Sequence, residues 1–483
     1  MSTVQRIAKN TMALGLSQII TSAAGMILFI FIARFLGDVE FGKFSFAQSF
    51  TGILVIFADV GLSSFTIREV ARDRELASKY LGNVALIKLL LSGITFTLII
   101  LIINLMDYPK DTTFIVYLFG ISTILNSFSM FFRSIFKAFE RMEYEAYLNI
   151  TRSAIKTSTG LLLIFYGYGL IEVVYVFVFA EIINLFLSLF VTVKRFAKPT
   201  VEIDFKLWRH LISGALPFCM TLVVGMLYLR IDVVMLSVMK GDAAVGWYNA
   251  ACTIVYGLVF IPNILSSAVF PVMSRLFTSS TDALKVMIEK FAKYSFITAL
   301  PILIILIVLA DEFITIIYGN EFINSIITLQ ILSVYLSMRF VNHATGFTLS
   351  STNKEHLRAF SAAIAAGSNI ILNLFLIPKY SYVGAAVATV LTEVVLFSFY
   401  YYFTAKHFHR LPLQKTLLKP LISCLTVFGF IYYLREINPY LLASLSVIIY
   451  LTILFLIKTF DSDDISLFED ITNSFLKRGT KGD

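Results

Sequence analysis

Charged side chains inside long apolar segments are the residues of this sequence that could do chemistry. The bases are Lys88, Arg133, Arg152, Lys156, Arg230 and Arg339, and the acids are Asp59, Glu181, Asp232 and Glu393. Ionisable groups in apolar segments are costly unless they pair, line a water-filled cavity or bind a ligand. Arginine offers a planar fork of donors that suits phosphate, and lysine offers a compact charge. Basic residues grouped in a cavity therefore predict an anionic ligand.

Helical spacing gathers several of these residues on shared faces. One face of 112–136 carries Asn126, Ser129, Arg133 and Lys137, and one face of 147–166 carries Asn149, Arg152, Lys156 and Thr159. We predict that the six bases line a cationic substrate cavity, with Arg339 the strongest candidate. Two other interpretations stay open, because long basic side chains can snorkel to the interface and Arg230 can pair with Asp232. The four acids are either counter-charges or carriers of a coupling H+ or Na+.

The elements that hold these charges lie in lipid. Hydrophobic residues make up 58% of the 483 residues and charged residues only 14%, and the mean hydropathy is +0.84. A soluble domain carries about 25% charged residues, so this composition excludes a soluble enzyme. Cys219, Cys252 and Cys424 fall in apolar runs, which argues against a disulfide framework or a zinc site. We predict no metal and no cofactor.

A membrane-spanning helix needs about 20 mainly apolar residues. This criterion predicts an all-α polytopic membrane protein with 14 transmembrane helices. The predicted spans are 11–34, 44–67, 80–106, 112–136, 147–166, 171–193, 210–239, 245–274, 294–318, 323–350, 357–378, 381–405, 416–435 and 438–459. The stretch 281–293 has helical periodicity, and we expect it on the membrane surface.

Basic residues in the connections indicate the orientation. With both termini in the cytoplasm, 27 of the 39 Lys and Arg residues fall in cytoplasmic connections or at the span ends beside them, and six fall in outside connections or at the span ends beside those. This bias follows the positive-inside rule. We therefore predict a multi-pass protein of the cytoplasmic membrane with both termini cytoplasmic. The formal charge of +8 is then a topology signal, and nucleic acid is not an expected partner.

An internal repeat divides the chain. The pattern G-D-x-x-x-G-x-aromatic-x-x-A occurs at 37–47 and again at 241–251. Six spans separate the copies, so the two halves insert with the same orientation, as in transporters that alternate access between two lobes. The predicted domains are an N-lobe (1–194), a cytoplasmic linker (195–209), a C-lobe (210–405), two further spans (406–460) and a cytoplasmic tail (461–483).

Glycines and prolines mark the predicted turns and hinges. Gly37, Gly42, Gly241 and Gly246 belong to the two copies of the repeat, where glycine permits the tight reversal of a helical hairpin. Pro217 and Pro262 interrupt or bend spans of the second half. Hinges for lobe closure and static kinks that shape a cavity are both consistent with these prolines.

Several motifs in order resemble a known family. They are Lys9-Asn10-Thr11, Ala33-Arg34-Phe35-Leu36-Gly37, Phe41-Gly42-Lys43-Phe44-Ser45-Phe46-Ala47, Leu216-Pro217 with Asp232, Val245-Gly246-Trp247-Tyr248-Asn249-Ala250-Ala251, Phe270-Pro271-Val272-Met273-Ser274-Arg275 and Tyr382-Val383-Gly384-Ala385-Ala386-Val387-Ala388-Thr389 with Glu393. The chain resembles the polysaccharide-biosynthesis, lipid-linked oligosaccharide flippases of the multidrug/oligosaccharidyl-lipid/polysaccharide (MOP) exporter superfamily.

The resemblance implies a V-shaped, MATE-like fold of two six-helix lobes plus two C-terminal helices. It also implies a flippase that moves a polyprenyl-diphosphate-linked glycan from the cytoplasmic to the outer leaflet, for cell-surface polysaccharide or glycan synthesis. Expected partners are that glycan lipid, membrane lipid, a coupling H+ or Na+ and polysaccharide-assembly proteins.

Two other functions agree less well with the sequence. A multidrug-type antiporter of the same fold exports small cations and predicts an acidic cavity, whereas six bases against four acids favour an anionic cargo. A membrane polysaccharide polymerase needs a catalytic constellation on a sizeable outside loop, and the predicted outside loops are short. We therefore predict a transporter and not an enzyme.

Overall fold

The computed structural model describes residues 3–200, 202–434 and 438–460. Within these ranges every regular element is a helix, and nine helices are long and apolar enough to cross a membrane. The all-α polytopic class is therefore confirmed. The predicted tail 461–483 lies outside the described residues.

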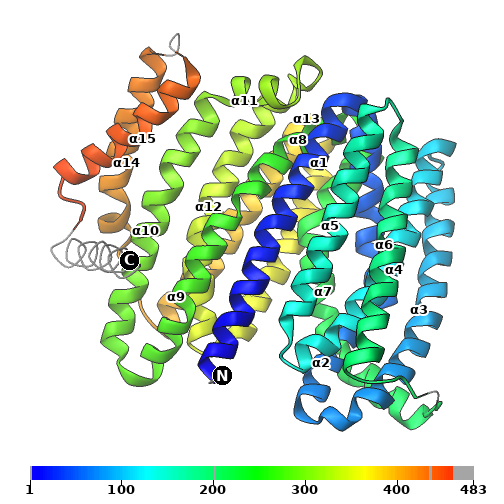
Figure 1. Cartoon of the computed structure of the whole chain (residues 1–483). Coiled ribbons are helices and arrows are strands. Elements are labelled where there is room, and N and C mark those ends of the chain that lie inside the picture. Colours follow the sequence, from blue (N-terminus) through cyan, green and yellow to red (C-terminus); the bar gives the residue numbers. More distant parts are fainter. Residues whose placement is uncertain (1–2, 201, 435–437, 461–483) are drawn as a thin grey trace, which may run out of the picture. The chain divides into compact units, whose positions relative to one another are not determined.

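The helices follow one another with short connections (Figure 1). They are α1 (Thr3–Leu54), α2 (Leu62–Arg72), α3 (Ala77–Leu105), α4 (Lys110–Ala138), α5 (Met142–Phe165), α6 (Leu170–Arg195), α7 (Phe205–Lys240), α8 (Asp242–Leu258), α9 (Phe260–Ser279), α10 (Thr281–Val308), α11 (Ala310–Ile317), α12 (Ser325–Ser351), α13 (Glu355–His407), α14 (Leu413–Tyr433) and α15 (Pro439–Leu456), with short 3-10 turns η1 (Val55–Ala58), η2 (Arg74–Leu76) and η3 (Asn320–Phe322). Each predicted span coincides with one helix, part of one helix or consecutive helical segments.

The two glycines that open the repeat have the same backbone conformation. Gly37 has φ 86° and ψ 174° within α1, and these non-helical values divide α1 into two helical segments. Gly241 has φ 82° and ψ −178° between α7 and α8. Positive φ at both positions favours glycine over residues with a Cβ. The duplicated sequence therefore builds the same turn twice.

One expectation about helix continuity was wrong. The span predicted at 44–67 is interrupted by η1 and by Gly61, which has φ 81°. The span predicted at 245–274 is interrupted at Val259 between α8 and α9, near Pro262, which was expected to interrupt or bend it and has no N–H to bond the carbonyl four residues earlier. The stretch 281–293 continues without a break through α10 to Val308, and its position on the membrane surface stays a prediction.

The chain forms two compact units. The first combines the described residues of 3–260, 314–328 and 359–396, and the second combines those of 261–313, 329–358 and 397–460. The units are not the predicted lobes 1–194 and 210–405, which therefore stay a prediction.

Each unit has its own apolar core. In the first unit, α1 packs along α8 and α5, and α4 packs along α6 (Figure 1). Helices α2, α3 and α7 share a cluster of buried side chains, which includes Phe65 of α2, Val84 of α3 and Leu211 of α7. In the second unit, α14 and α15 pack on α10 through residues such as Val427 and Tyr450. The two C-terminal helices thus bury apolar surface against a neighbour.

Candidate functional site

Three bases and one carboxylate form a cluster in the first unit. We call Arg133 of α4, Arg152 and Lys156 of α5, and Glu181 of α6 the basic cluster. Arg152 and Lys156 stand four residues apart, which places them on one helix face. Lys156 Nζ lies 2.6 Å from Glu181 Oε1, and Arg152 Nη1 lies 3.4 Å from the same oxygen. Sequence periodicity predicted the α4 and α5 faces, and the fold brings them to Glu181.

Asparagine side chains complete the cluster. Arg152 Nη1 donates to Asn126 Oδ1 at 2.7 Å, and Arg133 donates to Asn149. Asn184 Nδ2 donates to Glu181 Oε2 at 3.2 Å. These amides orient the charged groups without adding charge. Sequence reasoning had placed Asn126 and Asn149 on the polar faces but missed Asn184, although a polar residue one turn from Glu181 in an apolar span was the available signal.

The basic cluster carries more positive than negative charge. Among the described residues, Glu181 is the one carboxylate in ion-pair contact with a base of the cluster, and it pairs with Arg152 and Lys156. The Glu181 side chain is 2% exposed, while those of Arg152 and Lys156 remain 25% and 18% exposed. The buried Arg152 Nε has no hydrogen-bond partner within the described ranges. Uncompensated charge in a low-dielectric surrounding is costly, so the cluster is suited to an anion.

Lys88 has a counter-charge of its own. This lysine of α3 is fully buried, forms an ion pair with Asp59 and donates to Ser127 Oγ at 2.8 Å. Asp59 also accepts a hydrogen bond from Ser63 Oγ at 2.5 Å. The pair is electrically neutral. Its geometry favours the counter-charge interpretation for both residues over an open substrate site.

The acids of α7 and α13 contact hydroxyl groups. Asp232 is buried, and Tyr248 of α8 donates to it. Thr389 of α13 lies 3.5 Å from Asp232 Oδ2. Tyr228 donates to Glu393. The sequence did not indicate Tyr248 or Thr389 as partners, because they are distant along the chain and become neighbours only when the three helices pack.

Arg230 contacts an amide of α1. Its Nη1 lies 3.5 Å from Gln48 Oε1, while Asp232 on the same helix faces Tyr248. Residues two apart on a helix point in different directions, which explains why the described contacts include no ion pair between Arg230 and Asp232.

Arg339 belongs to the second unit, unlike the other five predicted bases. It lies on α12 and is half-buried. One turn further along α12, His343 Nδ1 lies 3.0 Å from Ser266 Oγ of α9. This contact fits a structural hydrogen bond for the histidine.

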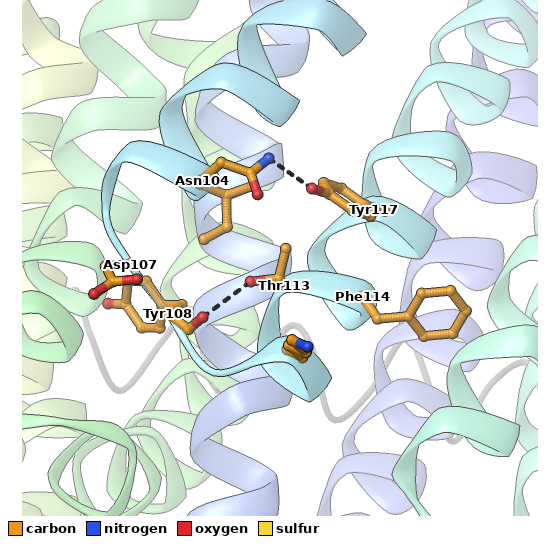
Figure 2. Close-up of a pocket in the computed structure, with 8 residues that line it drawn as sticks. Asn104, Asp107, Tyr108, Thr113, Phe114 and Tyr117 are labelled. Carbon is orange, nitrogen blue, oxygen red and sulfur yellow. Dashed lines mark hydrogen bonds between the residues drawn. The ribbon is translucent and has the colours of Figure 1, made fainter.

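A pocket of about 360 Å³ lies where α3 turns into α4 (Figure 2). Its polar groups bond one another, since Asn104 Nδ2 donates to Tyr117 OH at 2.7 Å and Thr113 Oγ1 donates to the Tyr108 carbonyl at 3.3 Å (Figure 2). None of the lining residues belongs to the charged clusters. We therefore place the candidate site at the basic cluster and not in this pocket.

No group of three or more His, Cys, Asp or Glu residues suited to a metal ion occurs in the described part of the chain. Cys219, Cys252 and Cys424 all carry free thiols.

Comparison with known proteins decides the family. A family model for polysaccharide biosynthesis proteins matches residues 7–277, which is more than half of the chain. The chain belongs to this family. One relative, the probable low-salt glycan biosynthesis flippase Agl15 of Haloferax volcanii, is 25% identical over 390 residues, covering 80% of this chain and 81% of that protein.

Solved structures share the fold of the present protein. The lipid II flippase MurJ in an inward closed conformation matches with a TM-score of 0.77 at 18% identity, over 92% of this chain and 98% of MurJ. An inward-facing multidrug resistance MATE family transporter of the MOP superfamily matches with a TM-score of 0.61 at 15% identity, over 80% of this chain and 95% of the transporter. The present protein is thus a multi-pass membrane protein with the MOP fold.

Proposed function

We propose that this protein is a flippase for a lipid-linked oligosaccharide. Its cargo is a polyprenyl-diphosphate glycan that moves from the cytoplasmic to the outer leaflet, for cell-surface polysaccharide or glycan synthesis. The name of the Haloferax relative supports a glycan flippase, and the family is that of polysaccharide biosynthesis proteins. The protein is then a transporter and not an enzyme.

The basic cluster is the observation that carries the proposal. Arg152 and Lys156 share one carboxylate and remain partly exposed, and Arg133 adds a third positive charge to the cluster. Charge-assisted hydrogen bonds to a diphosphate would satisfy the surplus charge, and the arginine fork can bind two phosphate oxygens at once. Glu181 then holds the two α5 bases in place between transport events. A neutral sugar or an organic cation gains nothing from such a cluster.

The remaining predictions form part of the same proposal. Lobes 1–194 and 210–405 alternate access to the two sides of the membrane. The protein lies in the cytoplasmic membrane, and both of its termini are in the cytoplasm. Arg230 extends the cationic lining, Arg339 of the second unit stays a predicted substrate-binding base, and Asp59 is the counter-charge of Lys88. Polysaccharide-assembly proteins receive the glycan. Asp232 and Glu393, which accept hydrogen bonds from tyrosines, are the acids we propose for coupling to H+ or Na+.

Leaflet transfer in proteoliposomes tests the proposal. We expect the wild-type protein to accelerate the exchange of a fluorescent polyprenyl-diphosphate sugar between leaflets. Arg152→Ala should slow this transfer about tenfold or more, since a hydrogen bond to a charged group contributes roughly 1.5–3 kcal/mol. Arg152→Lys keeps the charge but loses the fork, so its rate should lie between the two.

Lys194→Ala is the matched control. Lys194 is an exposed base on α6, the helix that carries Glu181, and lies outside the basic cluster. Its removal should leave transfer unchanged. Absence of transfer by the wild-type protein, together with export of cationic dyes, would replace the flippase with a multidrug-type antiporter.

A further inference from the structure

The two copies of the repeat contact each other reciprocally in the first unit. Gly42 of α1 lies against Asp242 of α8, and Gly246 of α8 lies against Asp38 of α1. Each glycine is the second one of its own G-D-x-x-x-G motif, and each aspartate is the second residue of the other motif. The contact is therefore symmetric in sequence and in space.

The distances leave no room for a side chain at either glycine. A Cβ on Gly42 would lie 1.9 Å from the carbonyl oxygen of Asp242, and a Cβ on Gly246 would lie 2.0 Å from that of Asp38. Both obstructing atoms belong to the backbone, so no rotamer change can relieve the clash. A side chain at either glycine would force α1 and α8 apart.

Side chains next to this contact in the sequence are buried. Phe41 and Val245, each adjacent to one of the two glycines, are 1% and 0% exposed, and Ser45 is 6% exposed. The contact lies beside the turns at Gly37 and Gly241, which are the ends of the hairpins in both copies. Backbone-to-backbone packing of this kind depends on small residues in membrane helices.

We propose that the reciprocal glycine–aspartate contact is a latch, which closes the two repeats against each other at the hairpin ends. The α1 copy comes from the predicted N-lobe and the α8 copy from the predicted C-lobe, so lobes that alternate access must part at this contact. This role in transport rests on the proposed function, whereas the latch itself is a property of the fold. A side chain at either glycine clashes only in the closed state, so it shifts the equilibrium of the two repeats toward the parted state.

Accessibility of a cysteine tests the latch without a transport assay. Ser45→Cys, with Cys219 and Cys252 replaced by alanine, places a reporter one turn from Gly42, and a hydrophilic maleimide is applied to detergent-solubilised protein. We expect slow labelling in this background, and labelling on the order of tenfold faster after Gly42→Ala or Gly246→Ala. Gly52→Ala is the matched control on α1, because a Cβ there meets no atom within 4 Å.

Native Cys424 separates opening from unfolding. It is buried on α14 in the second unit, so it should stay unlabelled while the reporter reacts. Unchanged reporter labelling in both alanine variants would overturn the latch, and so would labelling of Cys424 in parallel with the reporter.

Cross-linking provides a second test that needs no alanine variant. Asp38→Cys and Asp242→Cys, joined by a short reducible bifunctional reagent in a cysteine-free background, should stop lipid transfer, and reduction should restore it. Full transfer by cross-linked protein overturns the latch. If the reporter is labelled as expected but the protein transfers no lipid even before cross-linking, the flippase proposal is wrong. The latch is then still supported.

Discussion

Lys88 and Lys156 are both lysines of apolar helices, yet their surroundings differ. Lys88 has Asp59 as its own counter-ion, whereas Lys156 shares Glu181 with Arg152. Helical periodicity assigned both lysines to polar faces and could not separate them. The carboxylate that neutralises a base comes from another helix, and its position depends on packing.

The Lys88–Asp59 pair makes a prediction about stability. Lys88→Met alone leaves a buried carboxylate without its cation and should reduce the free energy of unfolding by about 3 kcal/mol. Lys88→Met combined with Asp59→Asn removes both charges and should recover most of that loss. Thermal unfolding in detergent measures both variants.

Lipid transfer by the same double variant tests the assignment of Lys88. We expect a rate close to that of the wild-type protein, because a neutral structural pair does not bind the cargo. A well-folded double variant without transfer would mean that Lys88 contacts the substrate.

At the scale of elements, the connection before α7 docks on the start of α3. Asn83 Oδ1 accepts hydrogen bonds from the Asp204 amide at 3.1 Å and from Trp208 Nε1 at 2.9 Å. Asp204 caps α7 by accepting from the amides of Lys206 and Leu207 at 3.1 and 3.0 Å. Lys79 Nζ lies 2.8 Å from the same carboxylate, and this hydrogen bond, with those from the cap, lowers the pKa of Asp204.

The lowered pKa of Asp204 predicts an acid-sensitive cap. A carboxyl whose pKa is lower in the folded state stabilises the fold above its unfolded pKa, and this contribution is lost as the pH falls through the folded pKa. Asp204→Ala should lower the melting temperature at neutral pH, and the difference from wild type should shrink at acidic pH. Asp204→Asn keeps a good capping side chain and should lose less.

Melting temperatures measured in detergent from neutral to acidic pH check this prediction. A constant difference between wild type and Asp204→Ala across that range would mean that the carboxylate charge does not contribute.

At the scale of the whole molecule, composition and the placement of charges determine which helices can be recognised as membrane spans. Nine helices among the described residues satisfy the length and hydropathy of a membrane span. Helix α5 is not among them, although it coincides with a predicted span, and it carries Arg152 and Lys156 of the basic cluster. Charged residues that serve a binding site lower the mean hydropathy of their helix. The residues that mark the site therefore also make the helix harder to recognise as a membrane span.

The predicted orientation can be tested by labelling in intact cells. Lys110 at the start of α4 is predicted outside, and Lys194 at the end of α6 is predicted inside; both side chains are exposed. An impermeant maleimide should label Lys110→Cys and spare Lys194→Cys until the membrane is permeabilised, as the positive-inside rule expects. The reverse pattern would invert the topology.

The sequence alone determined the membrane class, the helical spans and the duplicated turns. These follow from local causes, since hydropathy over about 20 residues and a glycine at a reversal act within one segment. Continuity was harder to predict at Val259 and near Gly61, where single residues break a span. Only the tertiary structure decided which charges meet.

Packing of α5 and α6 placed Arg152 and Lys156 beside Glu181, and packing of α3 left Lys88 paired with Asp59. The same holds for Gly42 and Gly246, since the repeat was visible in the sequence but its reciprocal contact was not. Contacts between segments separated by tens to hundreds of residues depend on how helices approach and rotate. One-dimensional periodicity carries no information on that approach.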